Sequence, residues 1–328
     1  MREVAYLTAP DADAAIAALS AHDNAMLLAG GTNVVDYLRI GVISPSVLID
    51  ISAVPLTGIQ AGEESFTAGG LARMSDVAAH PGVRGFFPVV SQALELSASA
   101  QLRNMATMGG NLMQRTRCGY FREPGFACNK RNPGSGCAAR DGLNRWHAVL
   151  GGSSHCVATH ASDLAVALVA LDATLELQGP AGARMVALSD FYRLPGDTPQ
   201  LENDLQPAEM IVAISAAAAP GAPGSHYLKV RERASYEFAV VSVAAVVHAP
   251  GGIIEAPRIA FGGVGTVPWR DHAAEQALTG VVAADSAALR SAAEAALAGA
   301  EPLTHNGFKV ELGRRALVRA VQLAAGVR

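Results

Sequence analysis

The sequence contains few charged and few aromatic residues. Of its 328 residues, 16 % are charged and 5 % are aromatic, whereas 50 % are hydrophobic. A chain of this composition has enough apolar surface to form a substantial core, which excludes the class of disordered proteins. We therefore expect a compact globular protein of two or three lobes.

A basic excess, a membrane-spanning run and a signal-type start are also absent from the sequence. The formal net charge is −4, which leaves no positive excess to neutralise a nucleic-acid backbone. The longest largely apolar stretches, Leu164–Ala173 and Phe238–Val247, are shorter than the roughly 20 residues of a membrane span. The start Met1–Tyr6 lacks the basic and apolar regions of a signal peptide. We expect no nucleic-acid partner, no membrane insertion and no signal peptide on this chain.

Cysteine is absent from most of the chain. The four cysteines fall within 39 consecutive residues, and the other 289 positions have none; they are Cys118, Cys128, Cys137 and Cys156. In a large chain without a signal peptide, clustered cysteines are more often metal ligands than disulfides. The sequence therefore predicts a metal site in this segment.

Hydrophobic periodicity and the positions of glycine and proline divide the chain into three parts. Residues 1–55 are predicted to form strands at 4–7, 25–28 and 47–51, with helices at 11–21 and 34–40. Residues 56–220 are predicted to contain helices at 87–96 and 162–168, a strand at 174–177 and an irregular stretch at 116–154. Residues 221–328 are predicted to form strands near 226–231, 239–248 and 257–263, then two Ala-rich helices. A long irregular stretch inside a compact domain indicates a functional segment.

Two loops have the composition of phosphate-binding turns. Each of them, Leu27–Val34 and Ala106–Leu112, contains a Gly-Gly pair flanked by hydroxyl and amide side chains. Glycine lets backbone N–H groups approach a diphosphate closely at the start of a helix. One such loop is typical of an ordinary turn, but two can converge on opposite sides of one elongated ligand. Their spacing differs from G-x-G-x-x-G, which disfavours a Rossmann fold.

Both loops, in this order and separation, resemble the FAD-binding lobe of the xanthine dehydrogenase and carbon monoxide dehydrogenase flavoprotein family. The likeness continues through Tyr227–Arg231 and covers nearly the whole chain. It implies an α+β chain with a PCMH-type FAD-binding fold of two α/β subdomains, residues 1–55 and 56–220. A C-terminal α+β domain of the CO dehydrogenase flavoprotein type, residues 221–328, would follow.

The resemblance also implies which residues contact FAD. They are Leu27, Leu28, Ala29, Gly30, Gly31, Thr32, Asn33, Val34, Thr107, Gly110, Asn111, Asp163, Ile211 and Lys229. The two loops would hold the diphosphate from opposite sides, and Asp163 would hydrogen-bond the ribose or ribityl hydroxyls. Ile211 would pack against the flavin, and Lys229 would lie at its isoalloxazine end. The sequence departs from the family at Ser97, where an aromatic residue often stands.

Two of these residues have simpler interpretations. Asp163 is equally suited to cap the helix that follows it. Lys229 is, by base rate, a solvated strand residue.

The cysteines lie in an insertion, at about residues 114–157, between the second glycine loop and the Asp163 helix. The insertion resembles that of bacterial periplasmic aldehyde oxidoreductase FAD subunits, which implies a 4Fe-4S cluster bound by Cys118, Cys128, Cys137 and Cys156. Four thiolates form a soft site suited to zinc or iron-sulfur, and the absence of a C-x₂-C pair disfavours a zinc ribbon.

The insertion also has a local basic excess. Against the single acid Glu123 stand six basic residues, Arg115, Arg117, Arg122, Lys130, Arg131 and Arg140. These cations would stabilise an anionic cluster, or form a solvated surface that docks a partner. His147, His155 and His160 lie near the cysteines and receive no assigned role.

The resemblance implies an oxidoreductase subunit that passes electrons from a large molybdenum cofactor subunit and a small 2Fe-2S subunit through FAD to an external acceptor. The substrate would be an aldehyde bound on another chain, and the complex a heterotrimer. Location would be the periplasm, by co-export with a partner subunit, or the cytoplasm. The alternatives are a freestanding FAD oxidase of the vanillyl-alcohol type and a zinc-stabilised, non-redox assembly protein.

Overall fold

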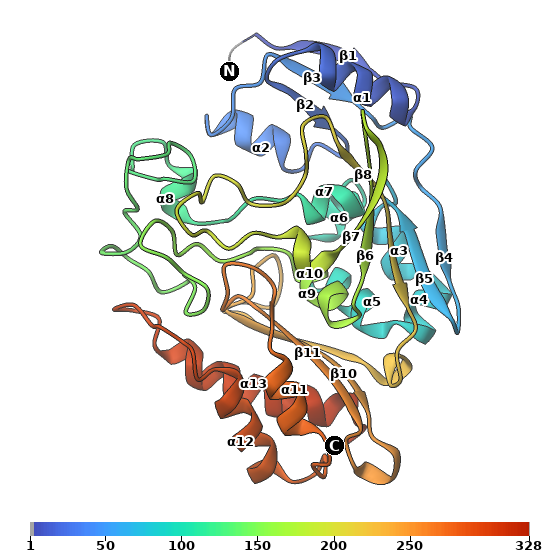
Figure 1. The fold of residues 1–328 in the computed structure, drawn as a ribbon, viewed down its shortest axis with the longest axis vertical. Helices are drawn as coiled ribbons and strands as arrows, with labels where there is room; N and C mark the ends of the chain where they lie inside the picture. Colours follow the sequence, from blue (N-terminus) through green and yellow to red (C-terminus); the bar gives the residue numbers. More distant parts are fainter. Residues whose placement is uncertain (1–2, 328) are drawn as a thin grey trace.

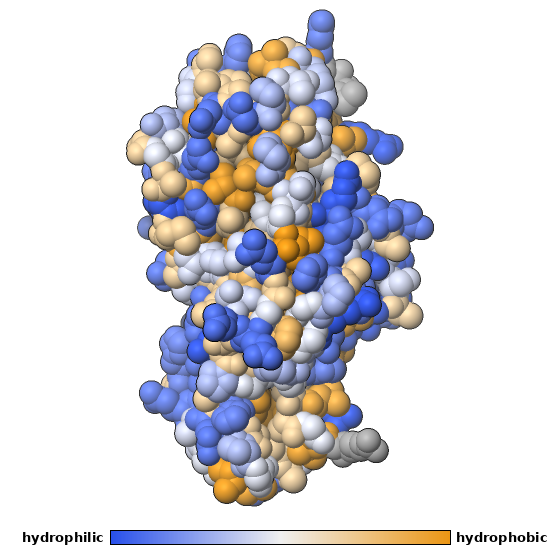
Figure 2. Space-filling model, turned by 90° about the vertical axis from the view of Figure 1, so that its right-hand side faces the viewer, coloured by the Kyte–Doolittle hydropathy of each residue, from blue (hydrophilic) through white to orange (hydrophobic). Residues whose placement is uncertain are grey.

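The computed structural model describes residues 3–327, arranged as three lobes that follow one another along the long axis (Figure 1). Met1, Arg2 and Arg328, at the outer ends of the first and third predicted domains, lie outside the described residues. Across the described chain, no helix combines the length and apolarity needed to cross a membrane. On the face shown in Figure 2, hydrophobic residues are gathered in small groups among hydrophilic ones.

The N-terminal lobe is a parallel three-stranded sheet of order β1-β3-β2. Its elements are β1 (Ala5–Thr8), α1 (Ala12–Ala21), β2 (Ala25–Leu28), α2 (Val34–Arg39) and β3 (Val47–Asp50). All five elements confirm the prediction. Helix α1 begins after Asp11, whose carboxylate accepts a hydrogen bond from the Ala14 N–H at 2.8 Å, and it buries Ala15 and Ile16 in the core of this lobe.

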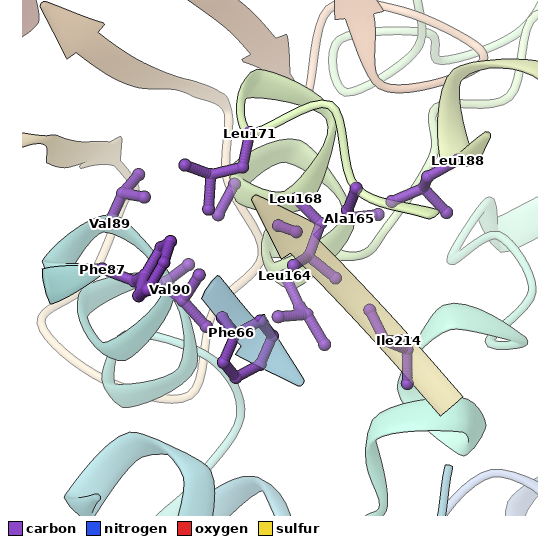
Figure 3. Packing of buried hydrophobic residues seen from close by; sticks show 14 of the residues in the cluster. Phe66, Phe87, Val89, Val90, Leu164, Ala165, Leu168, Leu171, Leu188 and Ile214 are labelled. Carbon is purple, nitrogen blue, oxygen red and sulfur yellow. The ribbon is translucent and has the colours of Figure 1, made fainter. Parts of the chain in front are cut away.

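The central lobe is an antiparallel five-stranded sheet of order β4-β5-β8-β6-β7 covered by helices. Its strands are β4 (Ile59–Ala61), β5 (Ser65–Gly69), β6 (Thr174–Gly179), β7 (Gly182–Ala187) and β8 (Met210–Ala217). Its helices are α3 (Met74–Ala79), α4 (Pro81–Phe86), α5 (Pro88–Glu95), α6 (Ala100–Arg103), α7 (Met108–Leu112), α8 (Gly119–Arg122), α9 (Asp163–Ala170) and α10 (Leu188–Phe191). Figure 3 shows Phe66 and Ile214 of the sheet packed with Phe87, Leu164 and Leu168.

The C-terminal lobe is an antiparallel four-stranded sheet of order β12-β11-β10-β9 with helices on both faces. Its elements are β9 (His226–Val230), β10 (Val241–His248), β11 (Ala256–Gly262), β12 (Trp269–Arg270), α11 (His272–Leu278), α12 (Ser286–Ala296) and α13 (Phe308–Ala324). Short 3₁₀ turns occur at Ala222–Gly224 and Pro250–Gly252. Strand β10 is buried on both faces, because Ala244 and Val246 belong to the central core whereas Val243 and Val247 belong to the C-terminal core.

The features that differ from the sequence prediction or were missed by it include the number of C-terminal helices, strand β8 and the cap of α9. Three helices follow the last sheet, not two. Strand β8 was not predicted, although it joins β5 and β6 and carries Met210 and Val212 into the N-terminal core. The cap of α9 is Ser162, whose hydroxyl accepts a hydrogen bond from the Ala165 N–H at 3.0 Å, so the capping interpretation of Asp163 was wrong.

The insertion is irregular as predicted, with α8 as its helix, and it projects at the left of Figure 1 between the N-terminal and C-terminal lobes.

Candidate functional site

The two glycine loops touch each other. A Cβ atom on Gly30 would collide with the backbone carbonyl of Met105, just before the second loop. The side-chain amide of Asn33 donates a hydrogen bond to the Gly110 carbonyl at 3.2 Å, across 77 residues of chain. The predicted convergence of the two loops is therefore present in the fold.

The backbone of both loops suits the turn into a helix. Gly31 has φ +73°, in the left-handed region that favours glycine, and its carbonyl accepts from the Val35 N–H in the first turn of α2. The Thr107 hydroxyl caps α7 by accepting from the Gly110 N–H at 3.2 Å. Each loop thus presents the start of a short helix to the same space.

That space contains two cavities that share Thr32 and Asn33 in their walls. The first, which we call the glycine-loop cavity, has a volume of about 420 Å³ and is walled by both glycine loops, β8 and the segment near Glu202. The second, which we call the Asp163 cavity, has a volume of about 450 Å³ and contains Asp163 and Lys229. Two adjoining cavities with a phosphate-type loop at the junction fit a dinucleotide, whose diphosphate lies between two ring systems.

Every predicted FAD residue except Leu28 lines one of these cavities. The glycine-loop cavity is lined by Leu27, Ala29, Gly30, Gly31, Thr32, Asn33, Val34, Thr107, Gly110 and Ile211. Thr32 and Asn33 also line the Asp163 cavity, together with Asn111, Asp163 and Lys229. Ile211 and Lys229, both expected beside the flavin, line different cavities.

A buried charge network lies in the second cavity. The Asp163 carboxylate, 6 % exposed, accepts from the Lys229 ammonium at 2.8 Å and from the Tyr227 hydroxyl at 2.6 Å. The Ser97 hydroxyl lies 3.0 Å from the same carboxylate. The Lys229 side chain is 1 % exposed, so its interpretation as a solvated strand residue was wrong. Burial and the neighbouring carboxylate raise the pKa of Tyr227 well above its usual value, which keeps this phenol a hydrogen-bond donor.

Tyr227 and Lys229 point to the same face of β9 because side chains two apart on a strand share a face. That alternation was the signal that could have identified Tyr227 from the sequence. Ser97 occupies the position of the missing aromatic residue, and its contact with Asp163 gives it a polar role instead. Tyr236 and Phe238, from the β9–β10 loop, are aromatic residues that line this cavity and were also missed.

The insertion contributes two arginines to the wall of the Asp163 cavity. Arg117 donates to the Asn33 side-chain oxygen at 2.6 Å and to Asp36 at 3.3 Å. Arg122 holds Asp36 with two hydrogen bonds of 2.7 and 3.0 Å. The Arg122 hydrogen bond and the charges of both arginines lower the pKa of Asp36, which keeps that carboxylate ionised. Both arginines line the Asp163 cavity, and sequence reasoning had no signal for a contact across 84 residues.

All four cysteines line one small cavity within the insertion. They are free thiols, and Cys128 and Cys137 are paired across a short antiparallel bridge. Burial, together with the nearby Cys128 and Cys156, raises the pKa of Cys118 to about 12, and burial also raises the pKa of Cys156. A thiol with so high a pKa is not an activated nucleophile, whereas a bound metal deprotonates it.

Among residues 3–327, no three His, Cys, Asp or Glu side chains are grouped closely enough to bind one metal ion. A four-iron cluster differs from a single ion in that the cluster itself separates the cysteine sulfurs. One cavity walled by four free thiols matches that donor set.

The six basic residues of the insertion form hydrogen bonds and ion pairs, some within the insertion and others with neighbouring segments. Arg131 donates to the carbonyls of Tyr120, Phe121, Pro124 and Phe126. Arg115 and Lys130 share Glu202, each at 2.8 Å, and Arg140 donates to the Ser153 carbonyl at 2.6 Å. Lys130 also lines the cysteine cavity. These contacts contradict the interpretation as a freely solvated basic surface.

Of the three histidines near the cysteines, His147 and His155 reach the cysteine site. Nε2 of His147 lies 3.1 Å from the Cys118 sulfur, and His155 lines the cysteine cavity. His160 packs against Tyr192, with 4.4 Å between ring centroids. Burial lowers the pKa of both His147 and His160 to about 4, so both rings are neutral.

Comparison with known proteins identifies the class. Residues 2–216 match the FAD binding domain in molybdopterin dehydrogenase, and residues 226–324 match the CO dehydrogenase flavoprotein C-terminal domain. The chain belongs to this family of FAD-binding oxidoreductase subunits, which confirms the predicted fold and the resemblance seen in the sequence.

Three known proteins are similar to this chain over most of its length. The aldehyde oxidoreductase FAD-binding subunit PaoB of Escherichia coli (strain K12) is 45 % identical over 306 residues, covering 92 % of each chain. The glyceraldehyde dehydrogenase medium chain of Sulfolobus acidocaldarius is 27 % identical and covers 85 % of this chain and 82 % of its own. The carbon monoxide dehydrogenase structure from Hydrogenophaga pseudoflava superposes with a TM-score of 0.76 at 24 % identity, over 99 % of this chain and 98 % of that one. At that identity the structural likeness supports the fold alone.

Proposed function

We propose that this chain is the FAD- and 4Fe-4S-carrying electron-transfer subunit of a heterotrimeric molybdenum-dependent aldehyde oxidoreductase. The observation that carries the proposal is the cavity walled by four free cysteines, on an insertion that reaches the wall of the Asp163 cavity through Arg117. The similarity to a chain named as an aldehyde oxidoreductase FAD-binding subunit supports an aldehyde as substrate.

The chain's own residues bind and orient the cofactors. The glycine loops would hold the FAD diphosphate where the two cavities meet, and Asp163 with Lys229 would fix the part of FAD in the second cavity. FAD accepts two electrons as a pair and releases them singly, whereas an iron-sulfur cluster carries one at a time. Substrate oxidation would take place on a large molybdenum cofactor subunit, with a small 2Fe-2S subunit between that centre and this chain.

The two alternatives fit these observations less well. A freestanding oxidase of the vanillyl-alcohol type needs its own substrate site, but the match to PaoB spans 92 % of each chain, and that relative is named as a subunit. A non-redox, zinc-stabilised protein would have no use for the paired cavities at Thr32 and Asn33. The compartment would follow the partners, being the periplasm by co-export or the cytoplasm.

The test is anaerobic purification of the complex with the wild-type chain and with Cys128→Ser. We expect about four irons and four sulfides per FAD in the wild type, because a Cys₄ site binds one 4Fe-4S cluster. Cys128→Ser should lose the iron and keep the FAD. The matched control is Ser154→Ala, an exposed residue of the same insertion, which should keep both cofactors. One zinc without iron would overturn the cluster, and a folded complex without FAD would overturn the flavoprotein assignment.

A further inference from the structure

His147 lies beside one of the cysteines in a defined orientation. Its Nε2 atom is 3.1 Å from the Cys118 sulfur, and the residue is 5 % exposed. The other ring nitrogen, Nδ1, is buried and has no hydrogen-bond partner among the described residues. A buried N–H without an acceptor is less tolerated than an acceptor without a donor. The proton of the ring therefore belongs on Nε2, where it points to sulfur.

The backbone of His147 is fixed from two sides. Its N–H donates to the Asn144 carbonyl at 3.0 Å within the insertion. Its carbonyl accepts from the Asn306 side chain at 3.1 Å and from the Lys309 ammonium at 3.0 Å. Asn306 and Lys309 belong to the C-terminal lobe, so that lobe sets the position of the imidazole at the cysteine site.

Lys309 is unusual because it is completely buried, with 0 % exposure, and has no counter-charge. Its ammonium donates to the carbonyls of His147 and Gly263, at 3.0 and 2.7 Å, and both acceptors are neutral. Within residues 3–327, no carboxylate forms an ion pair with it. Burial lowers the pKa of Lys309 to about 7, because a buried ammonium is costly unless an anion lies near it. An anionic cluster bound by Cys118, whose sulfur lies near the His147 ring, would be such an anion and would favour the charged form of Lys309.

We propose that His147 donates a hydrogen bond to the Cys118 thiolate and that Lys309 provides a buried positive charge behind it, so that both residues raise the reduction potential of the cluster. Hydrogen bonds to cluster sulfurs and nearby positive charge favour the reduced, more negative state. Both are positioning residues, since neither is a ligand. This inference rests on the proposed 4Fe-4S cluster.

The experiment compares the complete complex containing wild-type chain, His147→Leu, His147→Gln and Lys309→Met. The readouts are the iron-to-FAD ratio and the cluster midpoint potential, measured by a redox titration followed by electron paramagnetic resonance. We expect His147→Leu to keep its iron and to show a more negative potential. His147→Gln should recover much of that shift, because its amide is a donor of similar reach. Lys309→Met should shift the potential in the same direction as His147→Leu.

His305→Leu is the matched control, because His305 is an exposed imidazole at the same junction that bonds Asn144 and not a cysteine. Its potential should equal that of the wild type. Unchanged potentials in both His147→Leu and Lys309→Met would overturn the inference. If His147→Leu loses its iron, Lys309→Met decides, since it leaves the imidazole and all four cysteines in place. A wild-type complex without iron and sulfide would instead overturn the proposed function itself.

Discussion

The glycine-loop cavity and the Asp163 cavity, together called the cleft below, lie beside the cysteine insertion, but different interactions hold the two regions. The walls of the cleft include elements anchored in the hydrophobic cores. The backbones of its two loops approach so closely that a Cβ on Gly30 would collide with the Met105 carbonyl. In the described chain, no residue from 114 to 148 belongs to any of the three hydrophobic clusters. Arginine side chains bonded to carbonyls and carboxylates order that segment instead.

Because of this difference, we expect the two sites to depend on their ligands in different ways. A cleft defined by packed elements exists before its ligand binds, since close-packed cores resist change. The segment from 114 to 148 lies outside these clusters and has less apolar burial to offset its conformational entropy, so a bound metal would contribute directly to its folding. We therefore expect small steric changes to reduce FAD binding in the cleft. We expect the loss of polar contacts or of metal to destabilise the insertion.

The largest effect should come from a steric change in the cleft. Gly30→Ala places a methyl group against the Met105 carbonyl and forces the two glycine loops apart. Overpacking of this kind typically lowers the free energy of unfolding by about 1–3 kcal/mol, and occasionally by more. We therefore expect both lower stability and loss of FAD. Urea unfolding and the FAD content of the purified protein measure the two effects.

Gly58→Ala is the control for that experiment, because a Cβ there has nothing within 4 Å. It should leave FAD content unchanged. Full FAD occupancy in Gly30→Ala would show that the loop contact is not needed for binding.

A smaller, local effect should follow from removing the centre of the insertion's polar network. Arg131→Met deletes hydrogen bonds to four carbonyls while roughly keeping the length of the side chain. Hydrogen bonds from a charged donor contribute about 1.5–3 kcal/mol, so the free energy of local opening of the insertion should fall by about that amount. Limited proteolysis should cut the insertion faster, and iron content should fall while FAD is retained.

The control is Arg84→Met, which breaks an exposed salt bridge to Glu95 outside the insertion and should cost less than about 1 kcal/mol. Simultaneous loss of FAD in Arg131→Met would show that cleft and insertion fold as one unit.

The smallest effect should be seen at the link between the two regions. Arg117→Leu removes the hydrogen bond to Asn33 at the junction of the cavities. We expect FAD binding to weaken by about 1 kcal/mol, less than the full value of a charged hydrogen bond, because Arg117 acts through Asn33. Fluorescence titration with FAD measures the change. Arg122→Leu breaks contacts with Asp36 but none with Asn33, so its FAD affinity should fall less. Equal FAD affinity in Arg117→Leu and the wild type would show that the Arg117–Asn33 contact does not contribute to FAD binding.

Local patterns explain which parts of the fold could be predicted. Strand β2, helix α1 and the Asp11 cap follow from alternation, helical spacing and a capping carboxylate within a few residues. Strand β8 could not be predicted, because an apolar segment such as Met210–Ala217 gains its pairing only from β5 and β6. Capping of α9 by Asp163 was one of two interpretations of that residue, and Ser162 fills the role instead. Both residue types suit the position, and their different partners are distant in sequence.

The sequence by itself determined where the chemistry lies, because glycine pairs and clustered cysteines have local chemical requirements. It located both glycine loops and the four cysteines, which the fold places around shared cavities. Only the tertiary structure decided the charge environment of these sites. Lys229 and Lys309 appear in the sequence as ordinary lysines, and their burial depends on residues 66 and 162 positions away, Asp163 and His147. Desolvation and charge pairing depend on distance in space, which one-dimensional patterns do not record.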